Sequence, residues 1–103
     1  MKINRDIKIK KSNIHGLGIF AQNKINKNKT IGVGIEYKFF TIPIITKNFG
    51  SLINHSYKPN TRLYYKNSKY YIVANKNINK GDEITLNYNN TPWFIANAEK
   101  HYI

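Results

Sequence analysis

The middle of the chain holds a segment, residues 54–60, whose side chains could carry chemistry. Its sequence, Asn-His-Ser-Tyr-Lys-Pro-Asn, places an amide, an imidazole and a hydroxyl side by side, directly after the apolar pair Leu52-Ile53. The Pro-Asn end is a turn signal, and the proline holds the residue before it in extended backbone. Two interpretations are open. The segment is either a turn whose Asn and Ser side chains bond the local backbone, or a small-molecule site where polar groups converge on an apolar wall.

A second segment, His15-Gly16-Leu17-Gly18, predicts a tight turn flanked by glycines. Glycine lets a backbone approach a ligand closely and direct its N–H and C=O groups toward it. The spacing is neither that of a dinucleotide-binding loop nor that of a P-loop, so a nucleotide-phosphate cradle is not expected. Taken alone, a Gly-x-Gly pattern indicates a turn.

The composition limits the kinds of site that the chain can form. Its 103 residues suffice for one domain with a single modest core. The absence of cysteine excludes disulfides, zinc–thiolate sites and thiol catalysis. No apolar run reaches about 18 residues, and no apolar segment follows the first six residues. We therefore expect neither a membrane span nor a signal peptide.

The net charge of +12 has two explanations. A strongly basic protein attracts anionic partners, nucleic acid above all. However, Lys, Asn and Ile make up nearly half of the chain, and all three have A/T-rich codons, so compositional drift of the genome would raise the charge without any partner. The basic residues are also spread along the whole chain. Nucleic-acid binding is therefore a secondary hypothesis.

The elements that must position these segments are predicted to be strands. Short alternating or β-branched runs occur at residues 7–10, 19–21, 31–45, 62–65, 70–73 and 83–88. The first run alternates as a half-buried strand does, and Pro43 marks a break in the third. A four-residue loop, 66–69, joins the fourth and fifth runs as a hairpin. Only residues 93–101 have a weak helical pattern, so the expected fold is mostly β.

Two stretches of the chain repeat the same pattern. Residues 21–31 and 74–84 carry Ala, Ile, Lys and Ile at the same offsets. We expect each copy to form strand, turn and strand, with Ile25 and Ile78 facing inward. Asn28 and Gly81 occupy equivalent positions, and both residue types tolerate positive φ.

Four segments in order, followed by two aromatic residues, resemble the SET-domain protein lysine methyltransferases, most closely the very small stand-alone SET proteins of viruses and bacteria. They are residues 14–21, 49–60, 74–81 and 82–88, with Trp93-Phe94. The specific part is Asn-His-Ser-x-x-Pro-Asn, followed about twenty residues later by Gly-Asp-Glu-Ile-Thr-x-x-Tyr. The resemblance implies one minimal SET domain over residues 1–103, with its core at about 7–94 and a C-terminal tail at 95–103. The implied fold is mostly β, with small curved sheets, a C-terminal pseudoknot and a very short insert region.

The resemblance also implies a reaction, the transfer of a methyl group from S-adenosylmethionine to a lysine amine of a protein. The substrate would be a histone or another basic protein, the cofactor product would be S-adenosylhomocysteine, and no metal would take part. The resemblance implies three sets of cofactor-binding residues: those whose backbone contacts the methionine portion, two near the adenine and amino group, and an aromatic residue that covers the adenine. They are Gly16, Leu17 and Gly18; Asn54 and His55; and Trp93, with Phe94 as the alternative.

Tyr88 is the implied catalytic residue, and it also lines the cofactor site. Its hydroxyl would lie close to the transferring methyl group, where an oxygen stabilises the partial positive charge of the carbon. A structural alternative stays open for each aromatic or polar residue of the site. Tyr88 and Trp93 could be core aromatics, and His55 could brace the turn.

The insert at residues 36–47 departs from the family pattern, because in larger relatives this region is helical and forms one wall of the peptide groove. Leu86 stands where many relatives have a second tyrosine. The candidates for the substrate channel are Tyr37, Phe39, Leu86 and Phe94, with Phe40 as an alternative. The short insert leaves three outcomes open: loose substrate selection, a homodimer in which a second subunit completes the site, or lost activity.

Two rival functions stay open beside the enzyme. One is a non-catalytic SET-like module that binds a protein or nucleic acid, and the other is a basic β-domain that binds single-stranded nucleic acid through exposed tyrosines. For the enzyme we expect a protein substrate with a target lysine, contact with a nucleosome or nucleic acid through the basic surface, and no membrane contact. The expected localisation is intracellular, in the cytoplasm, or in the host nucleus for a viral protein or an effector.

Overall fold

The computed structural model describes residues 6–38, 42–47 and 49–87. In chain order the elements are β1 (Ile7–Lys11), β2 (Leu17–Ala21), β3 (Thr30–Lys38), β4 (Ile42–Ile45), η1 (Gly50–Leu52), β5 (Asn54–His55), β6 (Thr61–Lys66), β7 (Lys69–Ala74) and β8 (Thr85–Leu86). Apart from the short 3-10 turn η1, every regular element of these residues is a strand, so the mostly β fold is confirmed. No helix in the described part of the chain is long and apolar enough to cross a membrane.

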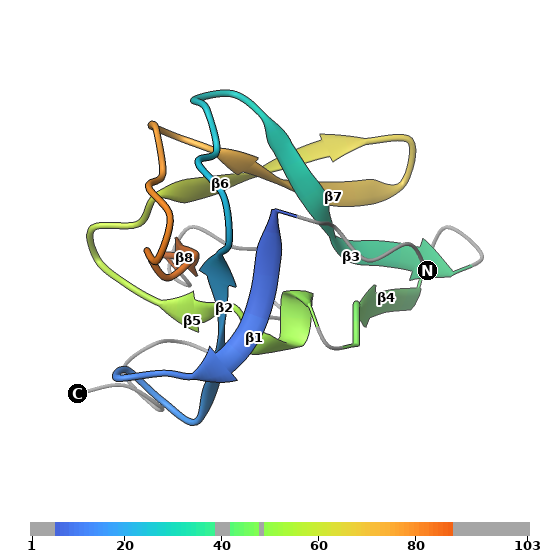
Figure 1. Ribbon diagram of the computed structural model, residues 1–103. Coiled ribbons are helices and arrows are strands. Elements are labelled where there is room, and N and C mark those ends of the chain that lie inside the picture. Colours follow the sequence, from blue (N-terminus) through green and yellow to red (C-terminus); the bar gives the residue numbers. More distant parts are fainter. Residues whose placement is uncertain (1–5, 39–41, 48, 88–103) are drawn as a thin grey trace.

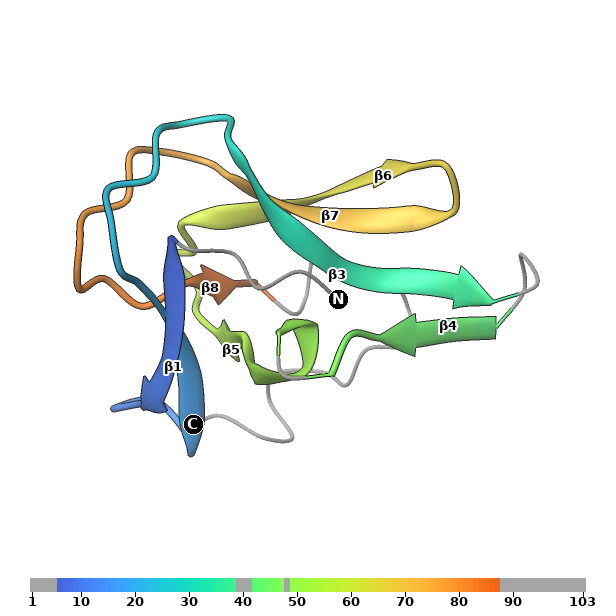
Figure 2. The same ribbon diagram turned by 45° about the vertical axis from the view of Figure 1, so that its right-hand side comes forward.

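The strands form three small sheets. One contains β1 and β2, the second has the order β4-β3-β7-β6, and the third contains β5 and β8. Figure 1 shows the four-stranded sheet and the β1–β2 hairpin on different sides of the molecule, and in Figure 2 the short β5–β8 pair lies between them. The segment at 54–60 therefore begins at the junction of the sheets.

The core between the sheets is built largely from isoleucine. Six isoleucine side chains are less than 2% exposed: Ile19, Ile25, Ile53, Ile72, Ile78 and Ile84. Burial of one such side chain stabilises the fold by about 1.5–3 kcal/mol. Ile53 directly precedes Asn54 and Ile84 directly follows Glu83. The core thus anchors both segments of the candidate site at the residue next to their polar groups.

The repeated pattern forms two matching corners, as predicted. Ile25 and Ile78 are each 1% exposed and pair with one another in an isolated antiparallel bridge. Their backbones exchange two hydrogen bonds, of 2.9 Å from Ile25 N to Ile78 O and 2.8 Å from Ile78 N to Ile25 O. Asn28 and Gly81 adopt φ of 73° and 93°. The repeat is therefore architectural, since its two copies close the core against each other.

The hairpin loop predicted at 66–69 is wrong by one residue at each end. Lys66 and Lys69 pair directly as the last residues of β6 and β7, which leaves a two-residue turn. Its residues, Asn67 and Ser68, have φ of 51° and 61°. Positive φ at both central positions is the mark of the type I′ turn, whose twist matches that of the flanking strands.

Two further local predictions are corrected at the edges of the sheets. β1 is mostly exposed, and its Ile9 side chain is 45% exposed, because of the residues of β1 only Ile7 packs against the core, while β2 supplies the buried Ile19 and Ala21. Pro43 does not break a strand but lies inside β4, opposite Tyr37 of β3. β4 is an edge strand, where the missing N–H of a proline is tolerated.

Candidate functional site

The two segments that carry the family motifs meet as a parallel strand pair. β5 pairs with β8 in the register Asn54 with Thr85 and His55 with Leu86, and the N–H of Ser56 continues the ladder to Leu86 O at 3.1 Å. The chain just before β8 is held on its other edge by β2, since Ile84 N donates to Ile19 O at 2.7 Å. The C-terminal segment therefore lies between the N-terminal hairpin and the segment at 54–60.

A polar cluster formed by Ser12, Asn54 and Glu83 ties these three parts together. The Ser12 hydroxyl lies 2.7 and 2.9 Å from the two carboxylate oxygens of Glu83, and the Asn54 amide donates to Oε2 at 2.8 Å. Ser12 is 8% and Asn54 4% exposed. Hydrogen bonds to a charged group contribute about 1.5–3 kcal/mol each, and a buried donor left without its acceptor is costly. The cluster is therefore a strong structural link between distant parts of the chain.

The same Asn54 amide holds the turn at residues 15–18. Its nitrogen lies 3.0 Å from His15 O and 3.3 Å from Leu17 O, and Ser12 N donates to Gly16 O at 2.8 Å. The Ser12 hydroxyl also accepts a bond of 2.9 Å from Ile14 N. The turn is thus fixed from its inner side by side chains that the fold buries.

The two glycines of this turn have different reasons to be glycine. Gly16 has φ of +47°, and no heavy atom lies within 4 Å of the position that a Cβ would take. At Gly18, a Cβ would lie 2.4 Å from Glu83 Oε2 and 3.1 Å from Ser12 Cβ. Gly18 therefore lets the carboxylate reach the polar cluster, whereas Gly16 leaves open space on the outer side of the turn.

Asn60, the last residue of the motif, fastens the other flank of the C-terminal segment. Its amide group bonds the backbone twice, with Nδ2 donating to Glu83 O at 2.8 Å and Oδ1 accepting from Thr85 N at 2.9 Å. The Thr61 hydroxyl donates to Thr85 O at 2.6 Å. The Asn60 side chain thus makes the hydrogen bonds that the backbone of a neighbouring strand would otherwise make. These bonds help to fix the register of β8 against β5.

His55 is the second residue of β5, paired with Leu86 of β8, and its side chain is buried. The residue is 4% exposed, and its ring packs edge-on against Tyr57 with centroids 4.3 Å apart and planes at 88°. Burial lowers the pKa of His55 below its usual value of 6.5, because desolvation disfavours the imidazolium. The site therefore contains a neutral imidazole at physiological pH.

The structure brings six of the predicted residues to this junction: Gly16, Leu17, Gly18, Asn54, His55 and Leu86. Tyr37 lies elsewhere, at the turn end of the four-stranded sheet, where its ring neighbours are Tyr70 at 6.2 Å and Tyr65 at 6.4 Å between centroids. Its backbone N–H donates to Ser68 O at 2.9 Å. Figure 2 shows this end of β3 well away from β5 and β8. The other predicted residues, Phe39, Tyr88, Trp93 and Phe94, lie outside the described residues, as does Phe40.

Sequence reasoning missed the roles of Ser12, Asn60 and Glu83. Asn60 belongs to the motif, but its Pro-Asn context indicated only a turn. Glu83 carried a signal, because it is one of five acidic residues in the chain and directly precedes the buried Ile84. Ser12 carried none, since its partner lies 71 positions away. Among the described residues, no group of three or more His, Cys, Asp or Glu side chains is arranged to hold a metal ion.

Comparison with known proteins agrees with this geometry. The SET domain family profile matches residues 38–89, which is half of the chain. A crystal structure of a Plasmodium falciparum protein, described as a "putative histone methyltransferase", is similar over 88% of this chain and 99% of that chain, with 27% sequence identity and a TM-score of 0.67. A search of curated protein sequences finds no significant match. The chain belongs to the SET domain family.

Proposed function

We propose that this chain is a protein-lysine N-methyltransferase that uses S-adenosylmethionine. Family membership and the similarity to the protein described as a "putative histone methyltransferase" support a methyltransferase role. The observation that carries the proposal is the bonding of the Asn54 amide to His15 O, Leu17 O and Glu83 Oε2. This one side chain joins the three segments to which the family resemblance assigns the site.

The turn at residues 15–18 fits a bound cofactor. The space beside Gly16 is open, and Leu17 is 53% exposed, so the backbone of the turn is accessible from outside. Asn54 holds it from inside, and a preorganised backbone loses little freedom when a ligand binds. We therefore assign the backbone of this turn to the methionine portion of S-adenosylmethionine, with Asn54 and His55 beside the amino group and adenine. When bound, the cofactor supplies a methyl group on a positively charged sulfur.

The chain's own contribution to the transfer is positional and electrostatic in this proposal. Tyr88 follows Leu86 by two positions, and Leu86 pairs with His55. The hydroxyl oxygen of Tyr88 would face the methyl carbon, where oxygen stabilises the developing positive charge. The target lysine must be neutral to attack, and an apolar channel lowers the lysine pKa because burial disfavours the ammonium. Trp93 would stack on the adenine, a contact of about 1–3 kcal/mol by analogy with base–aromatic stacking.

The carboxylates of the described residues do not form an acidic surface to which a basic substrate could bind. Glu83 is engaged by Ser12 and Asn54, and Asp82 Oδ2 accepts a bond of 3.0 Å from Asn79 N at a corner. Asp6 is paired with Lys29. Glu36 lies on β3, opposite Lys69 of β7 and on a different sheet from β8. We therefore propose that a histone or another basic protein would be selected through the target lysine itself, not through an acidic groove.

Calorimetric titration with S-adenosylhomocysteine tests the proposal directly. We expect binding to the wild-type protein, and equal binding to a Tyr88→Phe variant that no longer methylates mixed histones or cell lysate, because the ring keeps its place and only the hydroxyl is lost. Gly16→Val is the matched variant for the cofactor site and should weaken binding of S-adenosylhomocysteine. A β-branched residue is strained at φ of +47°, and its side chain fills the open side of the turn. Absence of binding at high micromolar S-adenosylhomocysteine would overturn the enzyme proposal for the monomer. Full activity of Tyr88→Phe would show that the Tyr88 hydroxyl is not needed for methyl transfer.

A non-catalytic SET-like module is the second candidate, and the β3–β4 hairpin favours it. Residues 35–38 pair with residues 42–45, so both ends of the short insert are part of a sheet. Little chain then remains to build the groove wall that larger relatives form with a helix. The same titration separates the candidates, because a module that binds protein or nucleic acid does not need S-adenosylhomocysteine.

A further inference from the structure

The β6–β7 hairpin presents one face to solvent that the site does not use. Residues directly opposite each other in an antiparallel pair share a face. The register places Tyr64 opposite Tyr71, Lys66 opposite Lys69, and Arg62 opposite Val73. Leu63 and Ile72, which alternate with them, pack into the core. We call the opposite surface, formed by Arg62, Tyr64, Lys66, Lys69 and Tyr71, the outer hairpin face.

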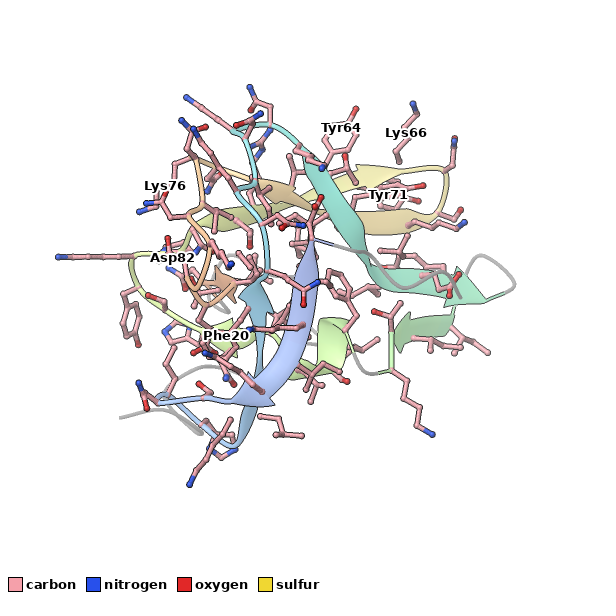
Figure 3. The ribbon with its side chains drawn as sticks, in the orientation of Figure 1. Phe20, Tyr64, Lys66, Tyr71, Lys76 and Asp82 are labelled. Carbon is pink, nitrogen blue, oxygen red and sulfur yellow. The ribbon has the colours of Figure 1, made fainter. Side chains whose placement is uncertain are left out.

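The aromatic rings of this face are accessible. Tyr64 is 52% exposed, Arg62 and Lys66 are exposed, and Lys69 and Tyr71 are partly exposed. In Figure 3 the Tyr64 and Lys66 side chains project from the hairpin away from the other two sheets. The Asn67-Ser68 turn at the tip has two residues with positive φ, so the strands stay in register up to Lys66 and Lys69.

The face carries an excess of positive charge. Glu36 of β3 lies opposite Lys69 of β7, whereas Arg62 and Lys66 have no acidic residue opposite them. Among the described residues, the basic side chains of this face make no ion pair. The Arg62 guanidinium bonds only uncharged oxygens, with Nη1 at 3.1 Å from Ala74 O and 3.0 Å from Asn75 Oδ1, and Nη2 at 3.3 Å from Asn28 Oδ1. These bonds orient the guanidinium and leave its charge available to an anionic partner.

We propose that the outer hairpin face binds single-stranded nucleic acid. Exposed tyrosine rings on a sheet offer flat surfaces on which unpaired bases stack, and flanking lysine and arginine side chains neutralise the phosphates. Acidic peptides would use the charges but not the rings, and duplex nucleic acid keeps its bases stacked inside the helix. The net charge of +12 adds attraction at long range. The face lies on a different sheet from the β5–β8 pair, so this inference stands apart from the proposed methyl transfer.

Fluorescence anisotropy with labelled 12-nucleotide oligothymidylate and oligouridylate, over a range of salt concentrations, tests the proposal, and the two oligomers compare DNA with RNA. Tyr64→Ala/Tyr71→Ala is expected to weaken binding at least about tenfold through the loss of stacking. Tyr64→Phe/Tyr71→Phe keeps the rings and should bind as the wild type does. Lys66→Gln/Lys69→Gln should lower the slope of log affinity against log salt by about 1.4, since each phosphate contact with a single strand contributes about 0.7.

Two matched variants separate the face from general charge and general aromatic exposure. Lys8→Gln/Lys11→Gln removes two exposed charges from β1, and Tyr57→Ala removes a 61% exposed ring outside the hairpin. Both should bind the oligomers nearly as well as the wild type, with circular dichroism confirming that every variant is folded. Equal losses in these controls, no loss in Tyr64→Ala/Tyr71→Ala, equal affinity for a duplex, or equally strong competition by polyglutamate would each overturn the proposal.

Discussion

At the scale of single residues, the polar cluster shows how a side chain distant in sequence from Asn54 and the 15–18 turn can help to position both. Glu83 accepts bonds from Ser12 and Asn54, and Asn54 in turn holds the carbonyls of the 15–18 turn. Loss of the carboxylate would therefore act on the turn through Asn54. Glu83 is a positioning residue in this scheme.

We predict that Glu83→Ala lowers the free energy of unfolding by about 2–4 kcal/mol, since two partly buried donors lose a charged acceptor. Chemical denaturation measures this loss. Glu36→Ala is the control, because Glu36 is exposed, and surface changes of this kind stay within about 0.5 kcal/mol. In a double-mutant cycle, Ser12→Ala should cost less in the Glu83→Ala background than in the wild type. Equal effects of Glu83→Ala and Glu36→Ala would contradict the role of the cluster.

The buried His55 makes stability depend on pH in a defined window. Its folded-state pKa lies below 6.5, and its unfolded value is about 6.5. As pH falls below about 6.5, the unfolded chain takes up a proton that the folded protein rejects, so stability decreases. We expect denaturation midpoints to be constant from pH 8 to 7 and to fall toward pH 5.

His55→Gln should flatten that part of the profile, because it removes the buried imidazole. Asp6 acts in a separate, more acidic window. Its hydrogen bond with Lys29 is the main cause that holds its pKa below 3.8, so its contribution is lost only as pH falls through that lower value. An unchanged slope in His55→Gln would show that another group causes the loss near pH 6.

At the scale of elements, the β6–β7 turn places a serine where glycine is preferred. Ser68 has φ of 61°, and a residue with a side chain costs about 1–2 kcal/mol at left-handed φ. Glycine avoids this cost, but part of the gain is offset because glycine loses more conformational entropy on folding. We predict that Ser68→Gly stabilises the protein by about 0.5–1 kcal/mol in chemical denaturation. Gly81→Ala, at φ of 93°, is the reciprocal control and should destabilise. A lower midpoint for Ser68→Gly would argue against the type I′ turn.

At the scale of the whole molecule, the features that could be predicted from the sequence are those that depend on a local pattern of residues. The corners at Ile25 and Ile78 were predicted because apolar spacing and residues that tolerate positive φ occur in both copies. The length of the hairpin turn was not, since Lys66 and Lys69 are equally compatible with loop and strand. The polar cluster was not predicted either, because its contact between Ser12 and Glu83 spans 71 positions and no local period encodes it.

That same separation has a consequence for how the protein is made. Closing a loop of about 70 residues costs about 4 kcal/mol of chain entropy, so the contact forms only when many others support it. On the ribosome, residues 15–18 emerge early, but the Glu83 carboxylate that helps to hold Asn54 in place is synthesised much later. A nascent chain that stops before Glu83 has the residues of the turn without the full set of bonds that fix it. The candidate binding turn is therefore completed late in synthesis, when the C-terminal segment docks between the two parts that preceded it.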